Sequence, residues 1–155
     1  MKAATLPTPG LLWGAYPERR SLKPRHPVLP GGLQVAVDRP LRAWEELGQR
    51  RLLTAVRAAE RDIGALDEDA FDAETRHLRL VVRGDGLSGA TLARALALVS
   101  EACRRELGWR LYDSQLIAAR IVLDNRLAEM ATGEGKTLAI GAAAATAALS
   151  GMPVH

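Results

Sequence analysis

The sequence contains a single cysteine, Cys103, in 155 residues. One thiol excludes both an intramolecular disulfide framework and a zinc site built from several cysteines, and it fits a reducing compartment. Cys103 lies in a helical pattern with no histidine close to it in sequence, which favours helix packing over catalysis. The three histidines, His26, His77 and His155, are too scattered along the chain to indicate a metal site.

Long apolar runs are also missing. The longest one, residues 138–149, is shorter than the roughly 18 residues that a membrane-spanning helix needs. Pro7 and Pro9 interrupt the start of the chain, so no signal peptide is predicted. The chain is therefore expected to be cytoplasmic. Its net charge of +3 mildly favours acidic partners such as nucleotides or anionic lipids, but it does not indicate specific nucleic-acid binding.

Proline is nearly absent after residue 40. Seven of the eight prolines lie within residues 1–40, at positions 7, 9, 17, 24, 27, 30 and 40. This spacing predicts an arm over residues 1–40 that forms no helix of any length. The arm is basic and carries a small apolar side, so two interpretations stay open: a poorly ordered leader, or a flexible arm that contacts an acidic surface or a partner subunit.

Residues 41–110 show helical periodicity and read as a scaffold. Apolar residues recur at intervals of three and four between Leu41 and Gly64, which predicts an amphipathic helix. A second helix is expected to begin after Asp67 or Asp69 and to end at the glycine-rich turn 84–86. Ser88 is a suitable cap for a third helix, with Gly108 just after its end.

The segment 126–149 carries the clearest chemical signal, because it reads as a strand, a glycine-bearing loop and a helix in succession. The loop, residues 132–137, has the sequence TGEGKT, and it resembles a P-loop, the phosphate-binding loop of many nucleoside triphosphatases. Gly133 and Gly135 allow consecutive backbone N–H groups to point at one anion at a helix start. Lys136 is placed to reach phosphate oxygens, Thr137 offers a hydroxyl to Mg²⁺, and Glu134 is expected on the outer, wet side.

Met130 stands where the general motif has its first glycine. A chance turn at a helix start is the alternative explanation for the pattern. The order of strand, loop and helix favours phosphate binding. Upstream, Gln115 opens a second helical run, and its amide could pair with the N6 and N7 atoms of adenine, or it could merely satisfy backbone groups at that helix start.

Residues 101–155 resemble the start of the motor domain of SecA, the ATPase of bacterial preprotein export. The family pattern has an arginine-rich helix, Leu-Gly, Arg, an aromatic residue, Asp, any residue and Gln-Leu. It continues, after an interval, with Ala-Glu-Met, any residue and Thr-Gly-Glu-Gly-Lys-Thr. The chain matches nearly all of it, including methionine at position 130. Ala118 and Ala119 depart from the pattern, because the family usually has two glycines there.

The resemblance implies the fold, the ligand and the partners of the chain. The expected fold is α/β: an incomplete RecA-like P-loop sheet with a helical N-terminal region, in which residues 127–131 and 153–155 are neighbouring parallel strands. Residues 111–155 would be the start of the nucleotide-binding domain, truncated just after the Walker A loop. The implied ligands are ATP and Mg²⁺, the latter held by Thr137 through the nucleotide. The implied nucleotide-binding residues are Gln115, Gly133, Glu134, Gly135, Lys136 and Thr137.

For the full-length family, the resemblance implies the SecYEG channel, preproteins and anionic phospholipids as partners. It also implies peripheral association with the inner face of the cell membrane. The resemblance allows a homodimer. The expected function is therefore that of an N-terminal part of the ATP-binding motor that drives protein export. Two other classes stay open. One is a part of another P-loop protein such as a DEAD-like helicase, and the other is a non-enzymatic remnant that acts as an interaction module.

The 155-residue chain is expected not to hydrolyse ATP by itself. In the resembled family a downstream acidic pair orients the attacking water and a second motor domain supplies arginines, and the sequence shows neither. Steady-state phosphate release with and without Mg²⁺ tests this expectation. Turnover of about 1 per second, within the usual range of enzymes, would contradict it.

Overall fold

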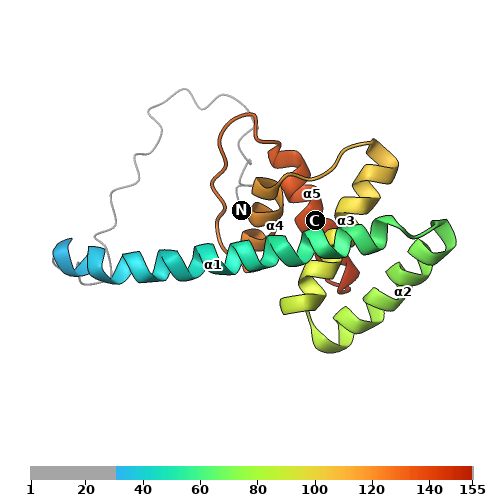
Figure 1. The fold of residues 1–155 in the computed structure, drawn as a ribbon, viewed down its shortest axis with the longest axis horizontal. Helices are drawn as coiled ribbons and strands as arrows, with labels where there is room; N and C mark the ends of the chain where they lie inside the picture. Colours follow the sequence, from blue (N-terminus) through green and yellow to red (C-terminus); the bar gives the residue numbers. More distant parts are fainter. Residues whose placement is uncertain (1–30, 155) are drawn as a thin grey trace, which may run out of the picture. The chain divides into compact units, whose positions relative to one another are not determined.

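Five helices make up the regular structure of the described residues. The structure, a computed structural model, describes residues 31–154, with side chains from residue 45 onward. Its elements are α1 (Gly31–Gly64), α2 (Glu68–Asp85), α3 (Gly89–Leu107), α4 (Asp113–Leu123) and α5 (Lys136–Leu149) (Figure 1). The chain divides into two units, Met1–Arg39 and Pro40–His155, and the site described below lies wholly within the second.

The predicted α/β architecture is wrong for the described residues, because residues 31–154 contain no strand. Residues 126–131 run as an irregular segment between α4 and α5, and residues 152–154 are irregular as well. A strand is stabilised by hydrogen bonds to a neighbouring strand, and a two-stranded pair is marginal by itself. Leu127, placed in the expected first strand, has a side chain that is 96% exposed, whereas Ala128 and Met130 are half-buried.

The first helix begins earlier than the proline pattern predicts. The structure has helix from Gly31 onward, so the expectation of no helix before Leu41 is wrong for residues 31–40. Six of the seven early prolines precede Gly31, and Pro40 alone falls inside the helix. A single interior proline removes one backbone hydrogen bond, at a cost of about 3 kcal/mol, and a helix can continue through it with a kink. The predictions made for residues 1–30 lie outside the described residues.

The predicted boundaries of α2 and α3 are confirmed. The Asp67 carboxylate caps α2 by accepting a hydrogen bond from the Ala70 N–H at 2.9 Å. Ser88 is the N-cap residue of α3, and its N–H donates to the Thr91 hydroxyl at 3.1 Å. Gly108 follows α3 in the left-handed conformation, at φ 72°, which only glycine adopts without strain.

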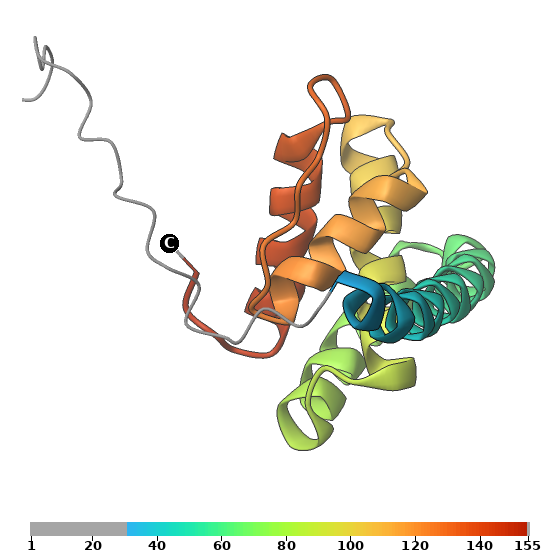
Figure 2. The ribbon, with the colours of Figure 1, turned by 90° about the vertical axis from the view of Figure 1, so that its left-hand side faces the viewer.

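Helix α3 is the centre of the hydrophobic core of the unit Pro40–His155. Nearly its whole circumference between Leu92 and Glu101 is buried, and its small alanines allow neighbouring helices to approach closely. Helices α2 and α5 pack against it, and α4 packs along α5 (Figure 2). The core side chains from the other helices are Val56 and Ile63 of α1, Leu78 and Val82 of α2, Leu116 and Ala119 of α4, and Ala142, Ala143 and Leu149 of α5.

Glu101 is a buried carboxylate on α3 that two arginines neutralise. Arg104 and Arg105, one turn further along α3, both donate to its oxygens at 2.7–2.8 Å. Arg105 also donates to the carbonyl of Leu66, at 2.6 Å, and stacks over the ring of Phe71. The hydrogen bond from Arg104 is the largest influence on the pKa of Glu101. Together with the hydrogen bond from Arg105 it outweighs the effect of burial and lowers that pKa to about 2.

Acidification should destabilise the fold through Glu101. Because the folded pKa is about 2 and the ordinary value is 4.5, this carboxylate stabilises the fold above about pH 4.5, and the stabilisation is lost as the pH falls toward 2. The full shift corresponds to roughly 3 kcal/mol. Urea unfolding of Glu101→Gln should therefore give a lower stability at neutral pH and a weaker loss between about pH 5 and pH 2 than the wild type.

Glu106→Gln is the matched control, since Glu106 is an exposed carboxylate on the same helix. It should leave both the stability at neutral pH and the acid dependence close to those of the wild type. Equal acid sensitivity in Glu101→Gln and the wild type would show that another group controls the acid transition.

Candidate phosphate-binding site

The predicted phosphate loop lies at the start of α5, after the long irregular connection from α4 (Figures 1 and 2). Gly133 and Gly135 both have positive φ angles, 92° and 75°, and Gly135 is the N-cap residue of α5. These angles turn the backbone back on itself just before the helix, as the glycine pattern predicts. Lys136 and Thr137 then form the first turn of α5, and both are exposed.

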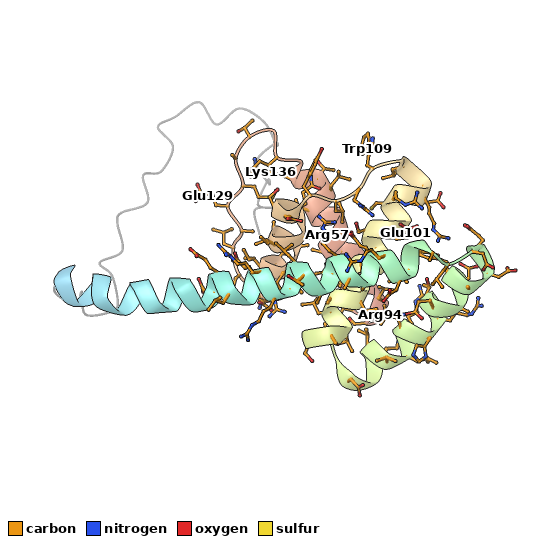
Figure 3. The ribbon with its side chains drawn as sticks, in the orientation of Figure 1. Arg57, Arg94, Glu101, Trp109, Glu129 and Lys136 are labelled. Carbon is orange, nitrogen blue, oxygen red and sulfur yellow. The ribbon has the colours of Figure 1, made fainter. Side chains whose placement is uncertain are left out.

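Two charged side chains hold the loop by binding the backbone of Ala131. The Glu134 carboxylate accepts from the Ala131 N–H at 3.0 Å, and the Lys136 ammonium donates to the Ala131 carbonyl at 2.9 Å. The Glu134 N–H reaches that same carbonyl at 3.4 Å. Lys136 consequently lies within the loop, whereas Glu129 extends outward from it (Figure 3).

Backbone donors at the loop remain open. Within the described part of the chain, the N–H groups of Gly133, Gly135, Lys136 and Thr137 have no hydrogen-bond acceptor. Donors of this kind at a helix N-terminus, together with the partial positive charge of the helix, are what an anion requires. The arrangement can bind phosphate oxygens, and the exposed Thr137 hydroxyl is available to a phosphate-bound cation.

Gln115 lies against this loop and is only 2% exposed. Its side-chain oxygen accepts from the Tyr112 N–H at 3.0 Å, and its amide nitrogen donates to the Glu134 carbonyl at 3.1 Å. The structure thus brings Gln115 against Glu134 and Gly135 of the predicted loop. It also uses Gln115 to tie α4 to the loop, a contact that the sequence pattern does not contain.

The contact between Gln115 and the loop explains a second requirement for glycine at position 135. A Cβ atom built on Gly135 would overlap the amide nitrogen of Gln115, whereas a Cβ built on Gly133 would meet nothing within 4 Å. Gly135 is therefore needed for its positive φ and for the close approach of Gln115. Gly133 is needed for its φ alone.

Arg57 of α1 holds the start of α4, and sequence reasoning missed it. Its guanidinium donates to the Leu111 carbonyl at 3.0 Å and to Asp113 at 2.5 Å, and it also binds both oxygens of Glu60. Partial burial opposes the charge of Arg57, but the hydrogen bonds to Glu60 and Asp113 prevail and raise its pKa. The only sequence signal is the spacing of three between Arg57 and Glu60, which is common on helix surfaces.

Two hollows lie near these elements, and neither is formed by the loop residues as a set. The larger, about 680 Å³, is lined by α1, the start of α3 and α4, together with Arg126 and Leu127. The smaller, about 80 Å³, lies between α4 and α5, and Lys136 is the one loop residue that lines it. Ala118 and Ala119 are buried, and Ala118 lines the smaller hollow.

Other site classes find no support among the described residues. No cluster of three or more histidine, cysteine, aspartate or glutamate side chains that could hold a metal ion occurs in residues with described side chains. Burial raises the pKa of the Cys103 thiol, which disfavours the reactive thiolate. None of the described helices combines the length and the apolar character that crossing a membrane requires.

Comparison with known proteins defines the class of the chain. The family model described as "SecA DEAD-like domain" matches residues 39–155, which include the whole site. Protein translocase subunit SecA 2 of Bordetella avium is 42% identical over 106 residues, or 68% of this chain and 16% of that protein. Protein translocase subunit SecA of Solidesulfovibrio magneticus is 42% identical over 108 residues, or 70% of this chain and 13% of that protein.

A plant relative shows the same similarity. The chloroplastic protein translocase subunit SECA2 of Arabidopsis thaliana is 38% identical over 113 residues, or 72% of this chain and 11% of that protein. The chain belongs to the SecA family, and the resemblance drawn from its sequence is confirmed. It spans about a sixth or less of the length of these relatives. No solved structure matches it.

Gly135→Ala should disrupt the loop more than Gly133→Ala does. Both substitutions force alanine to a positive φ, at a cost of about 1–2 kcal/mol, but only the methyl group at position 135 displaces the Gln115 amide. Thermal melting should show the larger loss for Gly135→Ala. Adding Gln115→Ala should remove most of the difference between the two glycine variants, and equal losses with an additive double mutant would contradict the contact.

Proposed function

We propose that this chain binds ATP with Mg²⁺ as part of the motor of a SecA-type protein translocase. The observation that carries the proposal is the loop around Gly133 and Gly135, whose open N–H groups meet the start of α5 beside Lys136 and Thr137. Membership of the SecA family supports the same ligand, because the matching family model describes a DEAD-like domain.

Lys136 would change partner when a nucleotide binds. Its ammonium now donates to the neutral carbonyl of Ala131, and a phosphate oxygen carries far more negative charge than that carbonyl. The side chain is exposed, so moving it to a phosphate breaks one hydrogen bond and costs little desolvation. In this proposal the Ala131 contact keeps the ammonium at the loop until the phosphates arrive.

Mg²⁺ would enter with the nucleotide, because the described residues offer no carboxylate cluster to hold the ion without it. Thr137 suits this role, since a hard cation prefers oxygen ligands and the hydroxyl lies in the exposed first turn of α5. When bound, Mg²⁺ neutralises part of the phosphate charge. The residues of the chain hold and orient the phosphates around it.

Gln115 is proposed to read the adenine base. Each of its two polar atoms already makes one hydrogen bond within the chain, and a carboxamide retains a second N–H and a second oxygen lone pair. That remaining pair matches the N6 donor and N7 acceptor of adenine. The side chain is buried, so base contact requires neighbouring side chains to move aside while the backbone at the start of α4 keeps its place.

The same proposal includes the partners and location of the SecA family. The compared relatives are named translocase subunits, so we infer a role with the SecYEG channel, preproteins and anionic lipids, with peripheral association at the inner face of the membrane. A DEAD-like helicase is not favoured, since the match extends beyond the loop through residues 39–155. A chain that folds but binds no nucleotide would favour an interaction module instead.

Lys136→Ala should weaken ATP binding by roughly one to two decades, because a charge-assisted hydrogen bond contributes about 1.5–3 kcal/mol and one decade corresponds to about 1.4 kcal/mol. Gln115→Ala should instead reduce the preference for ATP over GTP, and it should weaken phosphate binding less than Lys136→Ala does. Calorimetric titration of both variants with ATP and GTP measures the two effects.

Arg126→Ala is the control for Lys136→Ala. Arg126 lies in the same connection, is exposed and pairs with Glu45 at 2.9 Å, so its loss removes one positive charge without touching the proposed phosphate contact. If Lys136→Ala binds ATP as tightly as the wild type, or no more weakly than Arg126→Ala, the phosphate-loop assignment is wrong.

A further inference from the structure

All three nitrogens of the Arg57 guanidinium donate hydrogen bonds inside the molecule. One of them, Nη1, contacts both carboxylate oxygens of Glu60, at 2.9 and 2.7 Å. The other two nitrogens donate to Asp113 at 3.2 and 2.5 Å and to the Leu111 carbonyl at 3.0 Å. The planar fork of the guanidinium therefore reaches three acceptor groups at once.

These contacts connect α1 to the base-reading end of α4. Leu111 is buried, Tyr112 binds the Gln115 oxygen through its N–H, and Asp113 is the first residue of α4. Arg57 therefore holds the residues immediately before Gln115 at two points, the Leu111 carbonyl and the Asp113 carboxylate. Arg57 donates to residues at the start of α4, whereas Arg94 of α3 pairs with Glu74 of α2; both arginines are labelled in Figure 3.

Glu60 makes the position of Arg57 unambiguous. Its side chain is 3% exposed, and a carboxylate at such a depth requires a cation with good geometry. The pair holds the guanidinium plane, so that its remaining edge faces the Leu111 carbonyl and Asp113. Lysine has a single ammonium on a flexible stem and cannot satisfy three acceptor groups that a planar fork reaches together.

We propose that Arg57 is a positioning residue that sets the base preference of the nucleotide site. This inference rests on the proposed function, because in it Arg57 holds the Gln115 carboxamide in the orientation that contacts adenine. The path runs from Arg57 to residues 111–113, then to Gln115, and through the Gln115 amide to the Glu134 carbonyl of the phosphate loop. Arg57 itself touches neither the base nor the phosphates.

The first test uses Arg57→Lys in the 155-residue chain, with Arg94→Lys as the matched control. Arg94 also makes an interhelical ion pair, with Glu74, so its substitution causes a comparable loss of packing away from the site. Calorimetry with ATP, GTP and inorganic tripolyphosphate measures the effect. Arg57→Lys should reduce the ATP-to-GTP affinity ratio by about threefold to tenfold, half a decade to a decade in binding constant. The affinity for tripolyphosphate, which has no base, should fall by less than the affinity for ATP. Arg94→Lys should leave the ratio unchanged.

Asp113→Asn provides a second variant that does not disturb the buried glutamate. The Asp113 side chain is 59% exposed, so the substitution weakens the hold on α4 with little effect on the core. It should lower the same affinity ratio, by less than Arg57→Lys does. Hydrogen exchange without nucleotide should become faster at the amides of residues 112–116 in both variants, and stay unchanged there in Arg94→Lys.

The outcomes separate this inference from the proposed function. A wild-type chain that binds no ATP overturns the proposed function and the base preference together. Normal ATP binding with an unchanged affinity ratio in a folded Arg57→Lys overturns only the role of Arg57. An equal fall in the ratio for Arg94→Lys also overturns it, because general loss of packing would then explain the effect.

Discussion

The hydrogen bond from the Gln115 amide to the Glu134 carbonyl is the contact through which the helical scaffold reaches the phosphate loop. Gln115 is buried at the start of α4, whereas the loop itself is almost wholly exposed and has few contacts of its own. Exposed segments with few contacts open easily, so the position of this loop depends on the elements that flank it. Glycine at position 135 is what permits the approach.

The two buried glutamates show how charge organises the scaffold around that contact. Glu60 and Glu101 are each 3% exposed, and each is held by arginines. A buried carboxylate is tolerated only when it is paired and hydrogen-bonded, and removing its partner is strongly destabilising. In both cases an arginine continues to a backbone carbonyl of another segment, Leu111 for Arg57 and Leu66 for Arg105. The charges therefore fix the connections between helices as well as neutralising one another.

Lys136 and Glu134 give the loop a definite form before any ligand binds. The Glu134 carboxylate accepts from the Ala131 N–H, and the Lys136 ammonium donates to the Ala131 carbonyl. These two contacts close the turn that Gly133 and Gly135 permit. The backbone donors at the start of α5 stay open in this form. Two large apolar side chains on either side of the loop in sequence, Leu127 and Ile140, are exposed in the described structure.

The sequence by itself determined the helices and the loop. Capping residues, glycines and apolar spacing are local signals, so the limits of α2 and α3 and the turn before α5 could be read from Asp67, Ser88, Gly108 and Gly135. Family membership was also readable, because the motif from Gln115 to Thr137 has a characteristic order. The helix over residues 31–40 was missed because a proline count does not show whether one proline can be accommodated within a long helix.

Only the tertiary structure decided the rest. The expected strands did not form among the described residues, since pairing needs partners that a local pattern cannot reveal. The roles of Arg57 and Gln115 as ties between segments were equally hidden. Their partners lie 54 and 19 residues away in sequence, and such contacts exist only once packing on α3 has brought the helices together.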